Sequence, residues 1–242
     1  LIGLSVGSNV ATALAYGGIA GVLKLGEFDI LATSNLNRIR ARLDQIGMSK
    51  ISITAEQVYE INPYATIIPY AGGMTKESLV DFVTGTPTPR VIFEIIDHFE
   101  MKIHIRTLAR QARIPVVMIT NLGDRVLIDV ERYDLDPNTP FFNGRAGAVP
   151  DDMVKYPDIT TADKHRYAVA LAGVEHIPER ALASVADIGK TLVGRPQLAS
   201  AVTVAGGLCS YIARKIVLGE SLPSCSWLID FDILFGAKTA LT

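Results

Sequence analysis

Donor side chains of three kinds follow the second predicted strand of this sequence. Asn35, Arg38 and Lys50 stand within the stretch FDILATSNLNRIRARLDQIGMSK. An uncharged amide, a planar guanidinium and a compact ammonium together suit a polyphosphate, whose anionic oxygens lie along a chain. Arg40 and Arg42 in the same stretch fit a solvated helix face. The cluster favours a nucleoside polyphosphate, since hydride transfer needs no such cations here unless a 2′-phosphate is bound.

A carboxylate ends a later predicted strand. Asp97 follows the apolar run VIFEII, and doubly wound folds place ligand-facing groups at strand ends of this kind. Mg²⁺ prefers one or two carboxylates plus phosphate oxygens, so Asp97 is a candidate ligand for nucleotide-bound Mg²⁺. The alternative is structural, because an aspartate directly before HFEM also suits a helix N-cap. We expect His98 and His104 to be ordinary helix-face residues and not a metal pair.

Small residues form a turn between the first predicted strand and the first predicted helix. The segment GLSVGSN carries Gly3, Ser5 and Gly7. Such a turn lets a phosphate approach the backbone, while the helix N-terminus offers unpaired N–H groups. The spacing is one residue shorter than G-x-G-x-x-G, so a tight strand–helix turn without a ligand is an equal alternative. Glu27 follows about 20 residues later, where dinucleotide folds place an acid on the ribose hydroxyls; a solvated surface acid is the alternative.

These residues need a scaffold that brings strand ends together, and the alternation of elements predicts one. Apolar strand-like runs alternate with helical spacing from residue 1 to about residue 134. Such alternation is typical of a doubly wound, mostly parallel sheet with helices on its faces. The predicted fold class is therefore α/β and Rossmann-like. We expect RVLIDVERYD to be a strand that runs out to an edge of the sheet.

The chain changes character near residue 137. Pro, Asp, Gly and Thr dominate DPNTPFFNGRAGAVPDDMVKYPDITTADKH, which predicts a crossover of loops and short helices. The run PQLASAVTVAGGLCSYIARKIVLGE predicts a core-packed helix, and SWLIDFDILF predicts a closing strand. We expect one nucleotide-binding domain over 1–242, with a Rossmann-like core (1–134), a loop and helix crossover (135–196), and a C-terminal helix and strand (197–242).

Composition argues against several classes of protein. The 242 residues carry a net charge of −2, without the clustered basic excess that general nucleic-acid or membrane binding needs. No apolar run reaches the roughly 18 residues of a spanning helix. Two cysteines, Cys209 and Cys225, make neither a disulfide framework nor a four-thiolate zinc site. We expect a cytoplasmic protein and, because the sequence opens on Leu1 inside an apolar run, a piece of a longer chain.

The Gly turn together with LGEFDILATSNLNR, IGMSK, EINPYATI and IIDHF resembles the ThiF/MoeB/HesA superfamily of ubiquitin-activating-type enzymes. The resemblance is continuous over residues 1–134 and resumes more weakly at PQLASAVTVAGGL and the LGE that follows. It keeps the family's six-residue step from the strand-end acid Asp29 to Asn35 of SNLNR. SNLNR in this setting is the specific part of the resemblance.

The resemblance implies ATP-dependent adenylation of a carboxylate, with pyrophosphate as the leaving group. The implied cofactors are ATP and Mg²⁺, the implied substrate is the C-terminus of a ubiquitin-like carrier protein or a small carboxylate, and the implied assembly is a homodimer. No nucleic-acid or membrane partner is expected. The positions that would contact the nucleotide are Gly3, Ser5, Gly7, Glu27, Ser34, Asn35, Arg38, Lys50 and Asp97.

Three of these positions are implied catalytic residues. Arg38 would contact phosphates, Lys50 would stabilise the charge of the transition state, and Asp97 would hold Mg²⁺. Glu27 stands where the family has an aspartate on the ribose.

Departures from the family pattern leave other hypotheses open. His98 replaces the asparagine of a usual Asp-Asn pair, and Lys102 stands where arginine is common. The paired CxxC motifs that bind zinc in many relatives are absent, so no structural zinc is expected, and no thioester-forming cysteine is evident. The alternatives are an NAD- or FAD-binding oxidoreductase and a catalytically degenerate family member.

Overall fold

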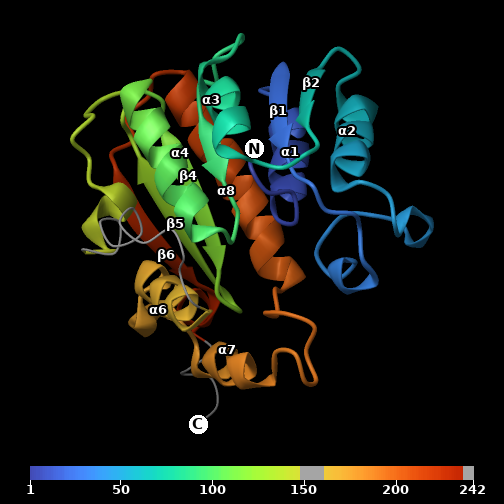
Figure 1. Cartoon of the computed structure of the whole chain (residues 1–242), viewed down its shortest axis with the longest axis vertical. Coiled ribbons are helices and arrows are strands. Elements are labelled where there is room, and N and C mark those ends of the chain that lie inside the picture. Colours follow the sequence, from blue (N-terminus) through green and yellow to red (C-terminus); the bar gives the residue numbers. More distant parts are fainter. Residues whose placement is uncertain (148–160, 237–242) are drawn as a thin grey trace.

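The computed structural model describes residues 1–147 and 161–236 of the chain (Figure 1). Apolar runs form its strands, and segments with one apolar face form most of its helices. The strands are β1 (Val22–Gly26), β2 (Thr66–Tyr70), β3 (Ile92–Glu94), β4 (Val116–Asn121), β5 (Arg125–Glu131) and β6 (Cys225–Asp230). The helices are α1 (Gly7–Tyr16), α2 (Lys50–Ile61), α3 (Lys76–Thr84), α4 (Phe99–Gln111), α6 (Thr161–Ala172), α7 (Glu179–Ser184), α8 (Ala199–Val217) and α9 (Phe231–Leu234). Short 3-10 turns are η1 (Thr33–Asn35), η2 (Leu43–Gln45), η3 (Phe141–Gly144), η4 (Val174–His176) and η5 (Val185–Asp187).

The sheet of the described residues has two parts that the N-terminal residues join. β1 pairs in parallel with β2, and β3 pairs in parallel with β4. Ile2 lies between these pairs and forms parallel bridges to Gly26 and Glu94. Gly3 N donates to Gly26 O at 2.9 Å, which fixes the start of the chain in the sheet. Because these strands are parallel, their carboxyl ends meet at one edge.

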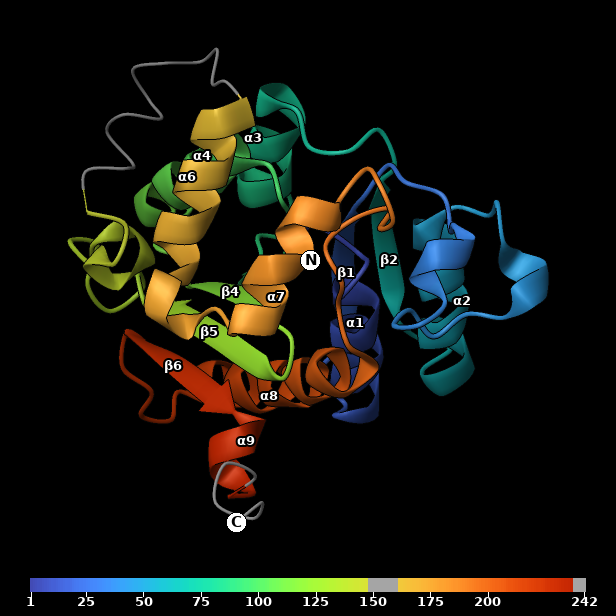
Figure 2. The ribbon, with the colours of Figure 1, turned by 90° about the horizontal axis from the view of Figure 1, so that it is seen from below.

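Helices cover both faces of the sheet. α3 and α4 lie on one face, while α1 and α8 lie on the other, as two perpendicular views show (Figures 1 and 2). α1 approaches α8 closely at Gly206, where an added Cβ would lie 2.9 Å from the carbonyl oxygen of Asn9. Cys209 is fully buried in α8, and burial raises the pKa of its thiol well above the usual value. It is therefore a core residue, which agrees with the core-packed helix predicted for this run.

The C-terminal part of the sheet differs from the prediction in two places. β5 is not an edge strand, because it pairs antiparallel with both β4 and β6. Residues 122–124 alone join β4 to β5, and so short a connection permits only an antiparallel hairpin. The closing strand ends at Asp230, whose side chain accepts a bond from Ile233 N at 3.2 Å and caps α9. The α/β, Rossmann-like architecture is confirmed: the sheet is parallel from β2 through Ile2 to β4 and antiparallel from β4 to β6.

Two helices between β5 and α8, α6 and α7, lie near the carboxyl edge of the sheet, in the lower part of Figure 1. Residues 148–160 of the predicted crossover lie outside the described residues, and the predicted division at residues 134 and 196 stays a prediction. No helix among the described residues is both long and apolar enough to span a membrane.

Candidate functional site

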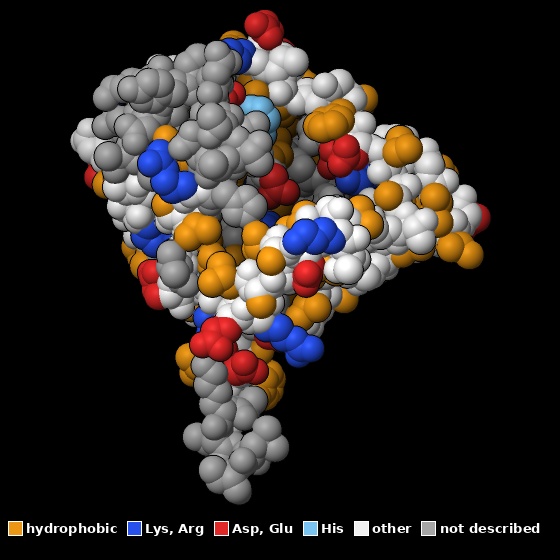
Figure 3. Space-filling view, turned by 60° about the horizontal axis from the view of Figure 1, so that its bottom comes forward, with side chains coloured by type: hydrophobic (Ala, Val, Ile, Leu, Met, Phe, Trp, Pro, Cys, Tyr) orange, Lys and Arg blue, Asp and Glu red, His pale blue; other side chains and the backbone are white. Residues whose placement is uncertain are grey.

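A cavity of about 530 Å³ opens at the carboxyl edge of the sheet, where residues 1–3, β1, β3 and β4 end. Figure 3 shows a hollow in this face, with acidic and basic side chains at its rim. Doubly wound sheets bind ligands at this place. Five of the predicted site residues line the cavity: Gly3, Ser5, Glu27, Arg38 and Asp97. Four others do not belong to the lining: Gly7, Ser34, Asn35 and Lys50.

Gly3 is required by the backbone of the first turn. Its φ is +92°, and an added Cβ would lie 2.3 Å from the carbonyl oxygen of Ile95. A side chain cannot fit there without moving the end of β3. Gly7 begins α1 under no such restriction, since an added Cβ would meet its nearest neighbour, Leu4 Cδ2, at an ordinary 3.4 Å. The turn therefore needs its first glycine and tolerates change at its second.

Glu27 is buried in the cavity wall, with 8% of its surface exposed. Its Oε2 accepts a bond from Leu4 N at 2.9 Å, and its Oε1 accepts from Phe28 N at 2.9 Å and from Asp29 N at 3.2 Å. These bonds hold the carboxylate against the Gly turn. A carboxylate has about four acceptor positions, so one remains for a ligand hydroxyl. The alternative of a solvated surface acid is wrong.

Asp97 points into the cavity and caps no helix. The N-cap of α4 is His98, whose Nδ1 accepts a bond from Met101 N at 3.3 Å. The Asp97 side chain is 92% exposed, and its Oδ1 lies 3.5 Å from Nη2 of Arg195. The capping alternative for Asp97 is therefore wrong, as is the expectation that His98 is an ordinary helix-face residue. The carboxylate remains available to a ligand.

The SNLNR motif folds into η1 and a following turn that places Arg38 at the cavity. Asn35 serves this turn, because its Oδ1 accepts a bond from Ala32 N at 3.0 Å. Arg38 Nη1 donates to Ser34 O at 2.9 Å and to Asn37 Oδ1 at 3.0 Å. Its Nε is buried without a hydrogen-bond partner among the described residues. The motif thus presents one guanidinium to the cavity, while Ser34 and Asn35 support the turn.

Lys50 lies just behind the cavity wall. It is the first residue of α2, and its side chain is 4% exposed. Its Nζ lies 2.7 Å from Asp29 Oδ2 and 3.2 Å from Ser5 Oγ. Both partners line the cavity. The ammonium is therefore one side chain away from the ligand space.

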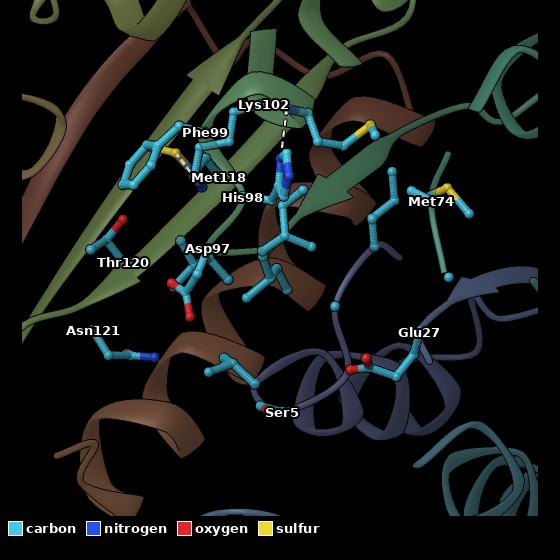
Figure 4. A pocket seen from close by; sticks show the side chains of 18 of the residues that line it. Ser5, Glu27, Met74, Asp97, His98, Phe99, Lys102, Met118, Thr120 and Asn121 are labelled. Carbon is cyan, nitrogen blue, oxygen red and sulfur yellow. Dashed lines mark hydrogen bonds between the residues drawn. The ribbon is translucent and has the colours of Figure 1, made fainter. Parts of the chain in front are cut away.

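The far side of the cavity holds residues that the sequence analysis does not select. Asn121 ends β4 at 4% exposure, and its Oδ1 has no hydrogen-bond partner among the described residues. Asn121 could have been predicted from its position at the end of a strand. Arg195 and Gln197 also line the cavity, but they come from the loop before α8, where no sequence pattern pointed to a site. In Figure 4, Asp97 lies between two groups of side chains. Glu27 and Met74 are on one side of it, and Phe99, Met118, Thr120 and Asn121 are on the other.

A buried ion-pair network lies beneath the cavity. Lys102, which lines the cavity, places its Nζ 2.6 Å from Glu94 Oε1. Arg106 reaches Glu94 Oε2 at 2.9 Å and Glu131 Oε2 at 2.9 Å. Burial alone would raise the pKa of Glu94, but Lys102 and Arg106 outweigh it and hold that pKa below its usual value. Lys102 therefore serves as the buried ion-pair partner of Glu94, although it lines the cavity.

The donor set fits a Mg²⁺ ion held mainly by phosphates. Asp97 offers an exposed carboxylate inside the cavity. Within the described part of the chain, no group of three or more His, Cys, Asp or Glu residues could hold a metal by itself. Mg²⁺ commonly takes one or two carboxylates plus substrate phosphates. One aspartate beside a bound nucleotide would supply such a set.

Comparison with known sequences identifies relatives of two kinds. The chain is 35% identical over 230 residues to the uncharacterized protein MT1398 of Mycobacterium tuberculosis (strain CDC 1551 / Oshkosh), covering 95% of this chain and 31% of that protein. It is 25% identical over 121 residues to tRNA threonylcarbamoyladenosine dehydratase of Escherichia coli (strain K12), covering 50% of this chain and 44% of that protein. The match thus covers less than half of either relative's length.

Solved structures share the fold. PaaA has a TM-score of 0.63 at 19% identity, covering 93% of this chain and 66% of that chain. MccB of E. coli, solved with ATP, has a TM-score of 0.62 at 17% identity, covering 92% of this chain and 56% of that chain. A sequence model of the ThiF family matches residues 2–240. Because this match spans nearly the whole sequence, the chain belongs to the ThiF family.

Proposed function

We propose that this chain is an ATP-dependent adenylyltransferase, of the type that activates ubiquitin-like modifiers, which converts a carboxylate into an acyl-AMP. The observation that carries the proposal is one cavity in which Glu27, Arg38 and the exposed Asp97 meet at the carboxyl edge of the sheet. An acid for ribose, a guanidinium for phosphate and a carboxylate for Mg²⁺ are the groups that ATP requires. Membership of the ThiF family and the likeness to MccB, solved with ATP, support the same nucleotide.

The nucleotide would extend from the β1 side of the cavity toward Asp97. Phe28, Gly73 and Met74 line the β1 side and offer apolar contact to an adenine ring. The remaining acceptor position of Glu27 would take a ribose hydroxyl. The phosphates would then pass the Gly turn and meet Arg38, with Lys50 close behind Ser5.

The proposed reaction is a displacement at the α-phosphorus of ATP. A carboxylate oxygen of the substrate forms the new bond to phosphorus, and the bond to the pyrophosphate oxygen breaks. Such a reaction depends on fixed positive charge near the phosphates and needs no protein nucleophile. Arg38 and Lys50 would supply that charge. Mg²⁺ at Asp97 would neutralise charge on the phosphate oxygens when bound.

The acceptor would enter on the β4 side of the cavity. Asn121 lies there, and its amide oxygen has no hydrogen-bond partner among the described residues. Thr120 and the apolar Phe99 and Met118 line the same side. The amide oxygen can accept from a peptide N–H, and the amide N–H₂ can donate to a carboxylate. The proposed acceptor is the C-terminus of a peptide or ubiquitin-like carrier, or a small carboxylate. MccB has been solved with MccA, which supports a peptide acceptor, and a homodimer is the proposed assembly.

The test is ATP–pyrophosphate exchange with a panel of acceptors. The panel holds peptides with free C-termini, ubiquitin-like carriers, small carboxylic acids and threonylcarbamoyladenosine. We expect exchange with one class of acceptor, and its loss in Arg38→Ala and in Lys50→Ala with the fold intact. Arg90, which is exposed and outside the cavity lining, provides the control variant Arg90→Ala. Wild-type exchange in both Arg38→Ala and Lys50→Ala would rule out the proposed roles.

A second candidate is nucleotide binding without turnover. The ion pair of 2.7 Å between Lys50 and Asp29 favours it, because this pair holds the ammonium outside the cavity lining. A chain that binds ATP by calorimetry yet exchanges no pyrophosphate with any acceptor would support this candidate. Binding of NAD(H) in preference to ATP would instead favour an oxidoreductase.

A further inference from the structure

Arg195 lies at the cavity although 98 positions separate it in sequence from Asp97, its partner there. It belongs to the loop that connects η5 to α8, and its side chain is 38% exposed. Its Nη2 lies 3.5 Å from Asp97 Oδ1, and the residue lines the cavity. A pair with so exposed a carboxylate contributes little stability. Arg195 is therefore held near Asp97 but is not committed to it.

Two hydrogen bonds from asparagine side chains to backbone carbonyl oxygens hold the segments of Arg195 and Arg38 at the same side of the cavity. Asn37 Nδ2 donates to the carbonyl oxygen of Gln197 at 2.8 Å, which ties the loop before α8 to the SNLNR turn. Asn9 Nδ2 donates to the carbonyl oxygen of Arg38 at 2.9 Å, which ties the same turn to α1. Two segments that are remote in sequence thus present their guanidinium groups to one space.

Arg38 and Arg195 are near enough for their charges to act on each other. Both guanidinium groups stay protonated in proteins, and Asp97 lies 3.5 Å from Arg195 and acts electrostatically on Arg38. Three further acids line the same cavity: Glu27, Asp29 and Glu100. Burial lowers the pKa of Arg38; Asp97 opposes this effect, and Arg195 adds to it. Arg38 Nε also lacks a partner among the described residues. An anion with several oxygens would relieve the repulsion between the two cations and occupy their free donors.

We propose that Arg195 binds the phosphates of the nucleotide, as a further cation beside Arg38 and Lys50. The proposal rests on the proposed function, because it takes ATP as the ligand. A phosphate chain is favoured over the acceptor carboxylate because Arg195 shares Asp97 with the expected Mg²⁺, which itself binds phosphates. When phosphates enter, Arg195 exchanges its weak contact with Asp97 for bonds to phosphate oxygens. Asp97 is then free for the metal.

The test compares ATP with adenosine by calorimetry, in the presence of a metal chelator. Arg195→Ala should weaken ATP binding about 10-fold to 100-fold and leave adenosine binding unchanged, because only ATP carries the groups that Arg195 bonds. Equal losses for ATP and adenosine would overturn the proposal. A loss that appears only with Mg²⁺ would also overturn it, since Arg195 would then act only by positioning Asp97.

Two further variants complete the experiment. Arg195→Lys should recover part of the ATP affinity, because an ammonium supplies the charge but not the planar fork. No recovery, together with a lowered unfolding midpoint, would trace the loss to folding and overturn the proposal. Arg90→Ala, the matched exposed arginine, should bind ATP as the wild type does. A wild type that binds no ATP would overturn the proposed function, whereas normal ATP binding by Arg195→Ala would overturn this inference alone.

Discussion

Two groups of charged side chains meet at the cavity, and they differ in how completely they are paired. Below the cavity, the Glu94 carboxylate forms ion pairs with Lys102 Nζ at 2.6 Å and with Arg106 Nη1 at 2.9 Å. None of these three side chains is more than 8% exposed. At the rim, Arg195 lies 3.5 Å from Asp97, which is 92% exposed, and the charge of Asp97 also acts on Arg38 without an ion pair between them in the described structure. Unpaired charge is costly in the interior but tolerable in water. Complete pairing therefore marks the charges that hold the fold, and incomplete pairing marks those available to a ligand.

The largest expected effect comes from the buried group. Arg106→Met should lower the free energy of unfolding by about 3–5 kcal/mol, because it leaves Glu94 and Glu131 buried without their guanidinium. Urea denaturation measures this loss. The control is Arg42→Ala, which removes an arginine that is 67% exposed and paired with the exposed Asp44. If Arg106→Met proved as stable as this control, the network would not be holding the fold.

The rim should show the opposite behaviour. Asp97→Asn should reduce ATP–pyrophosphate exchange by about 100-fold or more, since it removes the negative charge available to Mg²⁺. Its unfolding midpoint in urea should match the wild type, because the side chain is solvent-exposed. A large loss of stability in Asp97→Asn would place Asp97 with the buried group and break the comparison.

Glu27 is buried like the ion-pair network and lines the cavity like the rim residues. A substitution at Glu27 should therefore change both the stability and the ATP affinity of the protein. Glu27→Gln places an amide N–H₂ against the backbone N–H groups of Leu4, Phe28 or Asp29 that the carboxylate now satisfies. We expect a loss of about 1–2 kcal/mol in unfolding free energy. Calorimetry should also show weaker ATP binding. Lost stability with unchanged ATP affinity would make Glu27 a purely structural residue.

Salt should have the smallest effect and should separate the two groups without any mutation. Raising NaCl from about 0.05 M to about 0.5 M shortens the screening length severalfold, which weakens exposed charges more than buried ones. We expect ATP affinity to fall about fivefold. The stability difference between wild type and Arg106→Met should hardly change. A salt-insensitive ATP affinity would argue against the rim cations as its source.

Strand ends were predictable from the sequence because they depend on local patterns. Gly3, Glu27 and Asp97 each follow an apolar run, and the parallel strands bring such ends together. Asn121 follows the same rule at β4 and could have been found in the same way. The short connection after β4 also contained enough information to predict an antiparallel β5, since so few residues cannot form a crossover.

Arg195 and the buried network could not be predicted in this way. Arg195 sits in a loop without periodicity, and its contact with Asp97 depends on how the crossover returns to the sheet. Glu94 and Glu131 were visible as acids inside apolar runs. Their partners, however, depend on which helix packs over those strands. The pairings are products of tertiary structure, and no local pattern encodes them.

The capping role of His98 explains a departure from the family pattern. Asparagine is a favoured N-cap residue, and His98 performs the same task through its bond from Met101 N. In this chain the position after Asp97 therefore supplies a helix-starting acceptor without being asparagine. A motif search that demands Asp-Asn at this point would overlook chains like this one, whereas a search for an aspartate followed by any capping residue would retain them.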